Sequence, residues 1–238
     1  MRNQPSHPKP TRNSAIILPD LKFGEDKAFE TELHRRVDEY FDKAGIARSA
    51  PPSVYVKAII VLAACAAVYA LLVFVVTAPW LAIVLAMALG LAIVGIGVDI
   101  QHDGAHNAFS ARRWVNRMMA MTMDIIGASS YFWRWKHNRF HHTFTNIHLY
   151  DTDIDLGALG RISPSGQRRW YHRWQHLYLW LFYGLLVVKW QIFDDFSNTL
   201  RGRLGRHRIP RPRGVDLAIF FAGKAAFLRV PNSLFKIG

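Results

Sequence analysis

The strongest constraint on this chain is an apolar stretch that runs from Val54 to Ile100. Ala, Val, Leu and Ile make up almost all of it, and it is broken chiefly by one lysine near its start and by Thr77-Ala78-Pro79-Trp80 in the middle. A helix that crosses about 30 Å of hydrocarbon needs about 20 residues. The stretch therefore predicts two membrane-spanning helices, Val54 to Val76 and Trp80 to Ile100, joined by a tight turn.

Charge is separated from the apolar stretch along the chain. Hydrophobic residues make up 51% of the sequence, yet the formal net charge is +13, a combination that a soluble globular domain seldom needs. Lys and Arg crowd both flanks, whereas the connection between the two predicted spans carries neither. The positive-inside rule then predicts cytoplasmic flanks and a hairpin tip on the other side. Because the apolar stretch begins far from the N-terminus, a cleaved signal peptide is not expected.

This pattern predicts an all-α integral membrane protein, in which a two-helix transmembrane hairpin joins a cytoplasmic helical domain that contains clustered histidines. We divide the chain into a polar tail that is expected to be disordered, a cytoplasmic amphipathic helix, the hairpin, a cytoplasmic histidine-rich region with an interfacial helix, and the start of a second membrane segment. These parts are residues 1–25, 26–53, 54–100, 101–214 and 215–238. The last apolar run, Val215 to Leu228, contains Lys224 and is too short to span.

The amphipathic helix is predicted from about Asp26 to Ala44. Apolar residues recur every four positions among charged ones, and they are Phe29, Leu33, Val37 and Phe41. This spacing places them on one face. The face can lie on the membrane or pack on the cytoplasmic domain, and packing is favoured over a site for a partner.

Two histidine clusters follow the apolar stretch. The first is His102 and His106, and the second is His137, His141 and His142. Residues four apart project from one face of an α-helix, where two imidazoles can bind one metal ion. Neutral imidazole binds iron, copper, zinc and nickel, so the residues alone do not name the metal. A single pair of histidines is more often structural. Two histidine clusters that follow one another along the chain at the membrane surface favour a metal site.

An acidic patch follows the second cluster in an otherwise basic region. It contains Asp151, Asp153 and Asp155. These carboxylates can bind metal directly, orient a ligand imidazole, or pair with nearby arginines. They can equally form a solvated loop that offsets the local positive charge, and the sequence leaves these readings open. His148 is a weaker candidate for a further ligand.

Aromatic residues are dense from Trp170 to Phe193. The uncharged core of this segment, Leu177 to Val188, is too short to span, so an interfacial helix with its rings at headgroup depth is expected. His172 and His176 lie four residues apart within the segment. As a single pair they are interpreted as structural.

Two further features, an arginine-rich stretch and a single cysteine, do not indicate a separate functional site. The arginine-rich stretch from Arg201 to Arg213 has no accompanying RNA-binding motif, so contact with anionic lipid is favoured and no nucleic-acid partner is expected. Cys65, the only cysteine, lies inside the first span. Disulfides, thiolate metal sites and iron–sulfur ligation by this chain are thereby excluded.

Several motifs carry a family resemblance. They are Gln101-His102-Asp103-Gly104-Ala105-His106, Gly127-Ala128-Ser129-Ser130-Tyr131, Lys136-His137-Asn138-Arg139-Phe140-His141-His142-Thr143-Phe144-Thr145-Asn146 and Asp153-Ile154-Asp155. Together they resemble the membrane-bound fatty acid desaturase family, in particular its bacterial acyl-lipid or linoleoyl-CoA members. The likeness covers roughly Asp26 to Phe196.

The resemblance implies a non-haem di-iron centre on the cytoplasmic side of a four-helix membrane domain. Matched position by position, the iron ligands would be His102, His106, His137, His141 and His142, with no catalytic residue beyond them. With O2 as co-substrate, two hydrogens would leave adjacent methylenes of an acyl chain, giving a double bond and water. The implied partners are the bilayer, an acyl-lipid or acyl-CoA substrate and a ferredoxin or b-type cytochrome electron donor, in a bacterial inner membrane.

The sequence also departs from the family pattern. That pattern continues with two more membrane helices and a third histidine box, His-x-x-His-His or Gln-x-x-His-His, and this sequence has neither. Because five histidines do not complete the family's ligand set for two irons, activity of this chain alone is not expected, and it would be a fragment, a degraded copy or one part of an assembly. Two alternatives stay open: a related di-iron hydroxylase or ketolase, and a non-catalytic desaturase remnant.

Overall fold

The computed structural model describes residues 21–234 except 22 and 25, and among these it confirms an all-α fold with one two-residue strand pair. Most of the predicted tail, residues 1–25, lies outside the described residues. In chain order the elements are α1 (Ala28–Ala44), α2 (Pro52–Phe74), α3 (Pro79–Gly95), η1 (Ile96–Gln101), α4 (His102–Ala105), α5 (Arg113–Ala120), α6 (Thr122–Ile125), α7 (Ser130–Trp133), η2 (Arg134–His141), η3 (Trp170–Trp174), α8 (Gln175–Lys189), η4 (Trp190–Asp194), α9 (Asp195–Arg201), β1 (Arg203–Leu204), β2 (His207–Arg208) and α10 (Val215–Leu234). η1, η2 and η4 are π-helical, and η3 is a 3₁₀ helix.

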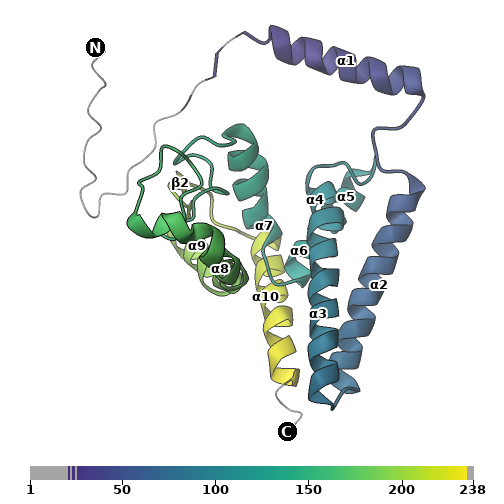
Figure 1. The fold of residues 1–238 in the computed structure, drawn as a ribbon. Helices are drawn as coiled ribbons and strands as arrows, with labels where there is room; N and C mark the ends of the chain where they lie inside the picture. The colour runs from purple at the N-terminus through teal and green to yellow at the C-terminus, as the bar shows by residue number, and fades with distance from the viewer. Residues whose placement is uncertain (1–20, 22, 25, 235–238) are drawn as a thin grey trace.

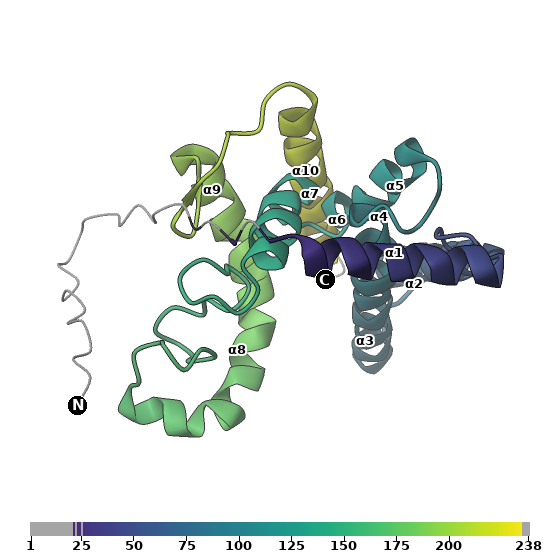
Figure 2. The ribbon, with the colours of Figure 1, turned by 90° about the horizontal axis from the view of Figure 1, so that it is seen from above.

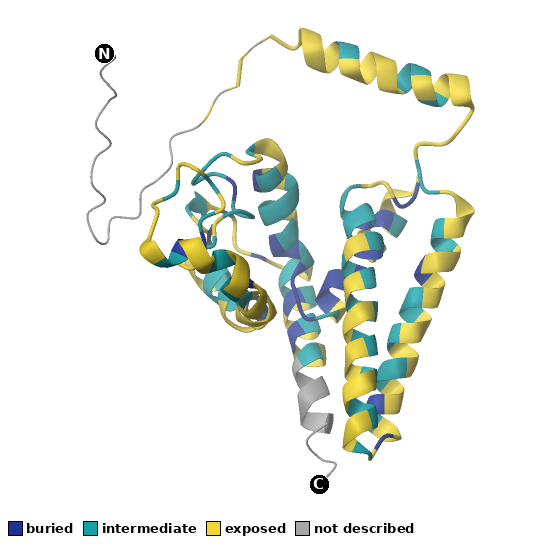
Figure 3. Ribbon diagram, in the orientation of Figure 1, coloured by how far each residue is buried: buried dark blue, intermediate teal, exposed yellow. Residues whose placement is uncertain are grey.

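α2 and α3 pack side by side as the predicted hairpin (Figure 1). Each begins at a proline, Pro52 and Pro79, which suits the first helical turn because the missing N–H has no partner there anyway. The second span therefore starts one residue before the expected Trp80, and through η1 and α4 it continues to Ala105. Both spans are long and apolar enough to cross a bilayer. Figure 3 shows exposed residues along most of the hairpin, as a lipid-facing surface requires.

A third continuous helical segment, Trp170–Arg201, also has the length and hydropathy of a membrane span. The sequence predicts instead that its apolar core is too short, but η3, α8, η4 and α9 join end to end and supply the missing length. In Figures 1 and 2, α8 runs across the direction of α2 and α3. That direction is the one expected of a helix lying along the membrane surface.

α10 extends to Leu234, beyond the apolar run that ends at Leu228. It contacts α2, α6 and α7. Lys224, which interrupts the run, is 4% exposed. Its Nζ donates hydrogen bonds to the carbonyl oxygens of Gly127 and Gln191 and to Oδ2 of Asp195, at 2.7, 2.7 and 2.6 Å. One buried lysine thus joins α10 to η4 and α9.

Two groups of buried apolar side chains support the histidine-bearing segments. The first contains Ala58, Ile96, Ile100 and Phe109 and joins α2 to η1. The second contains Tyr131, Phe132, Phe140, Leu204, Ile209 and Phe220 and lies under η2. Ile100 is two residues before the first histidine pair, and Phe140 lies between two histidines of the second cluster. Packing of these neighbours fixes the backbone from which the imidazoles project.

α1 shows the predicted apolar stripe. The helix ends at Gly45, which has a φ of +63°, and none of its residues is buried. Phe29 is 80% exposed, and Figure 1 shows α1 standing apart from the other helices. Of the two readings that the sequence left open, packing on the cytoplasmic domain is not seen among the described residues, and contact with the membrane surface stays a prediction. The following segment is tied elsewhere, because the N–H of Ala50 donates to the carbonyl of Ala108.

Gly104 lies where α4 passes against α5. An added Cβ would sit 2.6 Å from the backbone nitrogen of Ala120 and 2.8 Å from the carbonyl oxygen of Asn116. Backbone atoms cannot move away from the added methyl as a flexible side chain could. Gly104→Ala is therefore expected to lower the free energy of unfolding by about 1–3 kcal/mol, measured as a lower thermal midpoint in detergent. Gly97→Ala is the matched control, because its added methyl meets nothing within 4 Å. Equal midpoints for the two variants would contradict the prediction.

Candidate metal centre

The first histidine pair is carried directly by the second membrane-spanning helix. α3 passes into η1 and then into α4, whose first residue is His102. The N–H of His106 donates to the carbonyl of His102 at 3.0 Å, and the centres of the two imidazole rings lie 4.5 Å apart. The end of the span therefore presents two imidazoles together.

The second cluster lies on η2, where the helical register differs from the one assumed in the sequence analysis. The N–H of His142 donates to the carbonyl of His137, five residues earlier, which is the π-helical pattern. In an α-helix these two residues would point about 140° apart. In η2 their Nε2 atoms lie 3.2 Å from each other. The local π-helix thus gathers three histidines where an α-helix would align only His137 and His141.

The two clusters meet. The ring centres of His102 and His106 lie 5.3 and 5.5 Å from that of His137, and His106 lies 4.7 Å from His142. Potential ligand atoms of His102, His106 and His137 all fall within 4.8 Å of one another, and the same holds for His137, His141 and Asp153. All five predicted histidines therefore belong to one cluster, which we call the histidine cluster.

Two neighbouring residues without a role predicted from the sequence support the cluster. The side-chain amide of Asn138 donates to the carbonyl of Ala105 at 2.6 Å, which links the second cluster to the first. Trp133 stacks on His137 with 4.6 Å between ring centres and 25° between planes. Its position one helical turn before His137 is the sequence signal that could have indicated this contact.

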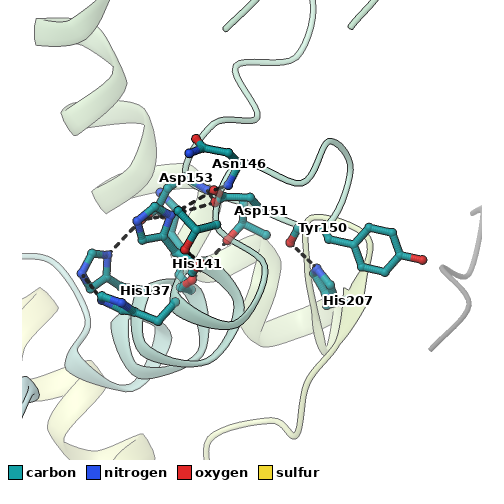
Figure 4. A network of polar contacts seen from close by, with 11 residues as sticks. His137, His141, Asn146, Tyr150, Asp151, Asp153 and His207 are labelled. Carbon is teal, nitrogen blue, oxygen red and sulfur yellow. Dashed lines mark hydrogen bonds and ion pairs between the residues drawn. The ribbon is translucent and has the colours of Figure 1, made fainter. Parts of the chain in front are cut away.

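Two of the three aspartates contact the imidazoles. Nδ1 of His137 lies 2.9 Å from Oδ2 of Asp153, and Nδ1 of His141 lies 3.0 Å from both carboxylate oxygens of Asp151 (Figure 4). A carboxylate accepts a hydrogen bond from Nδ1–H, and this tautomer leaves the Nε2 lone pair available to a metal. Among the open readings, the structure thus favours orientation of imidazoles for Asp151 and Asp153. Asp155 instead accepts from the N–H of Gly157 within its own loop.

The loop that carries these aspartates is tightly held. The Asp151 side chain is fully buried and also accepts from the N–H groups of Asn146 and Asp153, at 2.8 and 2.9 Å. Leu149 has a φ of +74°, a strained conformation for a branched side chain. His207 donates from Nε2 to the carbonyl of Tyr150 at 2.7 Å. Nothing in the arginine-rich stretch around His207 signalled this role.

Electrostatics keep two histidines of the cluster and one neighbouring carboxylate in the protonation state that metal binding requires. Burial and the neighbouring imidazoles lower the pKa of His106 to about 4, and the same causes lower the pKa of His142. Burial acts to raise the pKa of Asp153, but the hydrogen bond to His137 and the charge of Lys136 outweigh it and the pKa is lowered. At neutral pH these imidazoles are therefore neutral and this carboxylate is ionised.

The donor atoms fit a transition metal ion. Nε2 of His106 is buried and has no hydrogen-bond partner in the described part of the chain. Nε2 of His137 faces Nε2 of His142 at 3.2 Å, although His137 already directs its Nδ1 at a carboxylate. Two lone pairs at that distance repel unless a proton or cation lies between them. A divalent metal ion satisfies all three nitrogens.

The remaining candidate histidines lie elsewhere. His172 is buried, and its Nε2 lies 3.1 Å from the carbonyl of Ala158 while its Nδ1 accepts from the N–H of Arg169, so it has the structural role expected of it. Neither His148 nor His176 belongs to a group that can hold a metal ion within the described residues. The sequence interpretation that these three histidines are weaker candidates agrees with this placement.

Comparison with known proteins identifies the family. A model of the fatty acid desaturase family matches residues 78–234, a region that holds the whole histidine cluster. The chain belongs to the fatty acid desaturase family. With its apolar spans, this member of the family is an integral membrane protein. No solved structure matches the chain.

Several desaturases of known identity are similar to this family member. An sn-1 linoleoyl-lipid 6-desaturase from Arthrospira platensis is 37% identical over 89% of this chain and 58% of its own length, and the corresponding protein from Synechocystis sp. is 31% identical over 87% and 58%. An acyl-lipid (8-3)-desaturase from Physcomitrium patens is 32% identical over 85% of this chain and 43% of its own length. The chain thus spans about half the length of these relatives.

Proposed function

We propose that this chain carries the histidine cluster of a membrane acyl-lipid desaturase and that the cluster binds a di-iron centre through His102, His106, His137, His141 and His142. The observation that carries the proposal is the convergence of these five imidazoles, two of which are held at Nδ1 by carboxylates. The relatives named above are desaturases that act on acyl groups of lipids. Their names supply the reaction and the substrate class.

Bound iron would supply the O2 chemistry that an unactivated C–H bond requires. In the overall reaction an acyl –CH2–CH2– group, O2, two electrons and two protons give –CH=CH– and two waters. The residues of this chain would position the metal: Asp153 and Asp151 hold two imidazoles in the tautomer with a free Nε2. The membrane hairpin would hold the cluster at the bilayer surface, where a lipid-bound acyl chain reaches it.

The same proposal includes the location of the cluster and the source of electrons. Positive charge on both flanks of the hairpin supports a cytoplasmic location for the cluster. The resemblance to bacterial members of the family supports a bacterial inner membrane. Two electrons per double bond would come from a separate ferredoxin or b-type cytochrome.

The test combines metal analysis with product analysis. The chain is purified in detergent, and its iron, zinc and copper are measured per chain. We expect about two irons per chain and no stoichiometric zinc or copper, and a single iron per chain would contradict the di-iron centre. The loaded chain is then supplied with phospholipid, reduced ferredoxin and O2, and the fatty acids are analysed for a new double bond. Absence of bound iron would overturn the proposal, and a hydroxylated product would overturn the desaturase assignment.

Asp153→Asn is expected to weaken iron binding by about 10- to 100-fold, because an amide orients the His137 ring less well than a carboxylate that accepts its proton. Equilibrium dialysis against graded concentrations of ferrous iron measures the effect. Asp155→Asn is the matched control: it removes one carboxylate from the same loop, at a residue bonded only to Gly157 among the described residues. Equal losses in both variants would show that loop charge, and not imidazole orientation, governs affinity.

A further inference from the structure

A charged cavity adjoins the histidine cluster and has no part in holding the metal. Its volume is about 270 Å³, and it lies between the end of the second span, α5, the start of η2 and α10. Its wall includes Gln101, Arg113, Arg117, Trp133, Arg134 and Asp216. Three arginines against one aspartate leave an excess of two positive charges around the cavity.

Gln101 is the first sign that the cavity accepts a ligand. Its side chain is 1% exposed, and neither its oxygen nor its nitrogen has a hydrogen-bond partner within the described part of the chain. A buried amide that stays unpaired is costly, so such groups are nearly always hydrogen-bonded. A polar ligand group in the cavity would satisfy Gln101.

The arginines set the charge of that ligand. Arg134 lies 3.3 Å and Arg117 4.0 Å from the same oxygen of Asp216, so one carboxylate is shared by two guanidinium groups. Arg113 has no ion pair among the described residues. Guanidinium groups bind phosphate through paired N–H donors. The cavity therefore suits a phosphate better than a neutral sugar or another uncharged headgroup.

The cavity touches the cluster on two sides. Gln101 precedes His102 in the chain, and Trp133, on the cavity wall, stacks on His137. A group bound here would lie next to the atoms that hold the metal. We propose that the cavity binds the phosphate of the carrier to which the acyl substrate is attached. This inference rests on the proposed function, because it names the carrier of that substrate. Both a phospholipid headgroup and coenzyme A carry such a phosphate.

Binding of short-chain probes to the metal-free full chain in detergent tests this inference. Equilibrium dialysis compares dihexanoyl phosphatidylglycerol, hexanoyl-CoA and dihexanoyl galactosylglycerol, which has no phosphate. We expect one of the phosphate probes to bind at least tenfold more tightly than the galactolipid, and the tighter of the two identifies the carrier. Equal binding of all three probes would overturn the inference.

Paired variants assign the binding to the cavity. Arg113→Gln with Arg117→Gln is expected to weaken binding of the phosphate probe about tenfold, because two cations leave the wall. Arg168→Gln with Arg213→Gln removes the same charge from two exposed arginines outside the cavity and should bind like the unmodified chain. Equal affinities of the two double variants would overturn the assignment.

Two single variants distinguish phosphate binding in the cavity that Asp216 and Gln101 line from a purely structural role of these two residues. Asp216→Asn removes the competing carboxylate and should strengthen phosphate binding several-fold, whereas unchanged or weaker binding contradicts the proposal. Gln101→Leu should weaken phosphate binding without lowering the thermal midpoint of the ligand-free chain, because it removes an unpaired buried amide. Because these assays contain no iron, a chain that binds phosphate selectively but no iron would remove the proposed function and leave this site standing.

Discussion

Replacing His141 and His142 together by alanine is expected to abolish bound iron and, with it, any desaturation. His142 Nε2 faces His137 Nε2 at 3.2 Å, and His141 is the imidazole that the buried Asp151 holds. The double variant removes two of five converging imidazoles and leaves Asp151 without its histidine partner. Iron per chain, measured by elemental analysis after removal of loosely bound metal, should fall at least tenfold.

The control for this variant removes two other imidazoles. His34 and His176 are exposed residues outside the histidine cluster, so His34→Ala with His176→Ala should retain the iron content of the unmodified chain. Unchanged iron in the first double variant would show that the metal binds elsewhere. Loss of iron in both would show that general histidine content, and not the histidine cluster, accounts for the metal.

Replacing Lys224 by methionine is expected to cost about 3–5 kcal/mol of stability, because it leaves a fully buried carboxylate unpaired. Asp195 is 0% exposed and lies 2.6 Å from the lysine nitrogen, which also donates to two carbonyl oxygens. The loss should separate α10 from η4 and α9. The thermal midpoint in detergent and the protease sensitivity of α10 measure it.

Two comparisons distinguish this network from a general charge effect. Lys189→Met removes an exposed lysine that pairs with Asp194 at 2.6 Å, and because exposed ion pairs contribute little it should cost less than about 1 kcal/mol. Combining Lys224→Met with Asp195→Leu should recover much of the stability, since no buried charge remains unpaired. A double variant as unstable as Lys224→Met would contradict this account.

Much of the fold could be predicted because the apolar pattern along the chain is sufficient to locate membrane helices. The hairpin and the break near Pro79 need only length and hydropathy. The packing of α1 could not be predicted in the same way, because an amphipathic stripe such as that of Phe29 and Leu33 shows that a face is apolar without showing what covers it. The full length of the third apolar helix could not be predicted from its apolar core, since polar residues at its ends continue the helix.

The candidate site could be predicted as a set of residues but not as an arrangement. Their spacing in the sequence identified the five histidines as candidate ligands, and the structure places all five together. Spacing could not choose among the roles of Asp151, Asp153 and Asp155, because loop conformation decides which carboxylate reaches an imidazole. The roles of Asn138 and His207 could not be predicted, because each donates to a backbone carbonyl, and every residue has one whatever its side chain.

The π-helical register of η1 and η2 has a consequence for how such sequences tolerate change in length. Each segment holds one residue more than an α-helix would need for the same rise, and in η2 that extra residue turns His142 back toward His137. Losing a single residue there would let the backbone relax into the commoner α-helical form while swinging one imidazole away from the others. Outside the histidines, Asn138 and Phe140, the segment between Trp133 and His142 should therefore tolerate a substitution better than an insertion or deletion, and a relative with an alignment gap there is expected not to bind the metal.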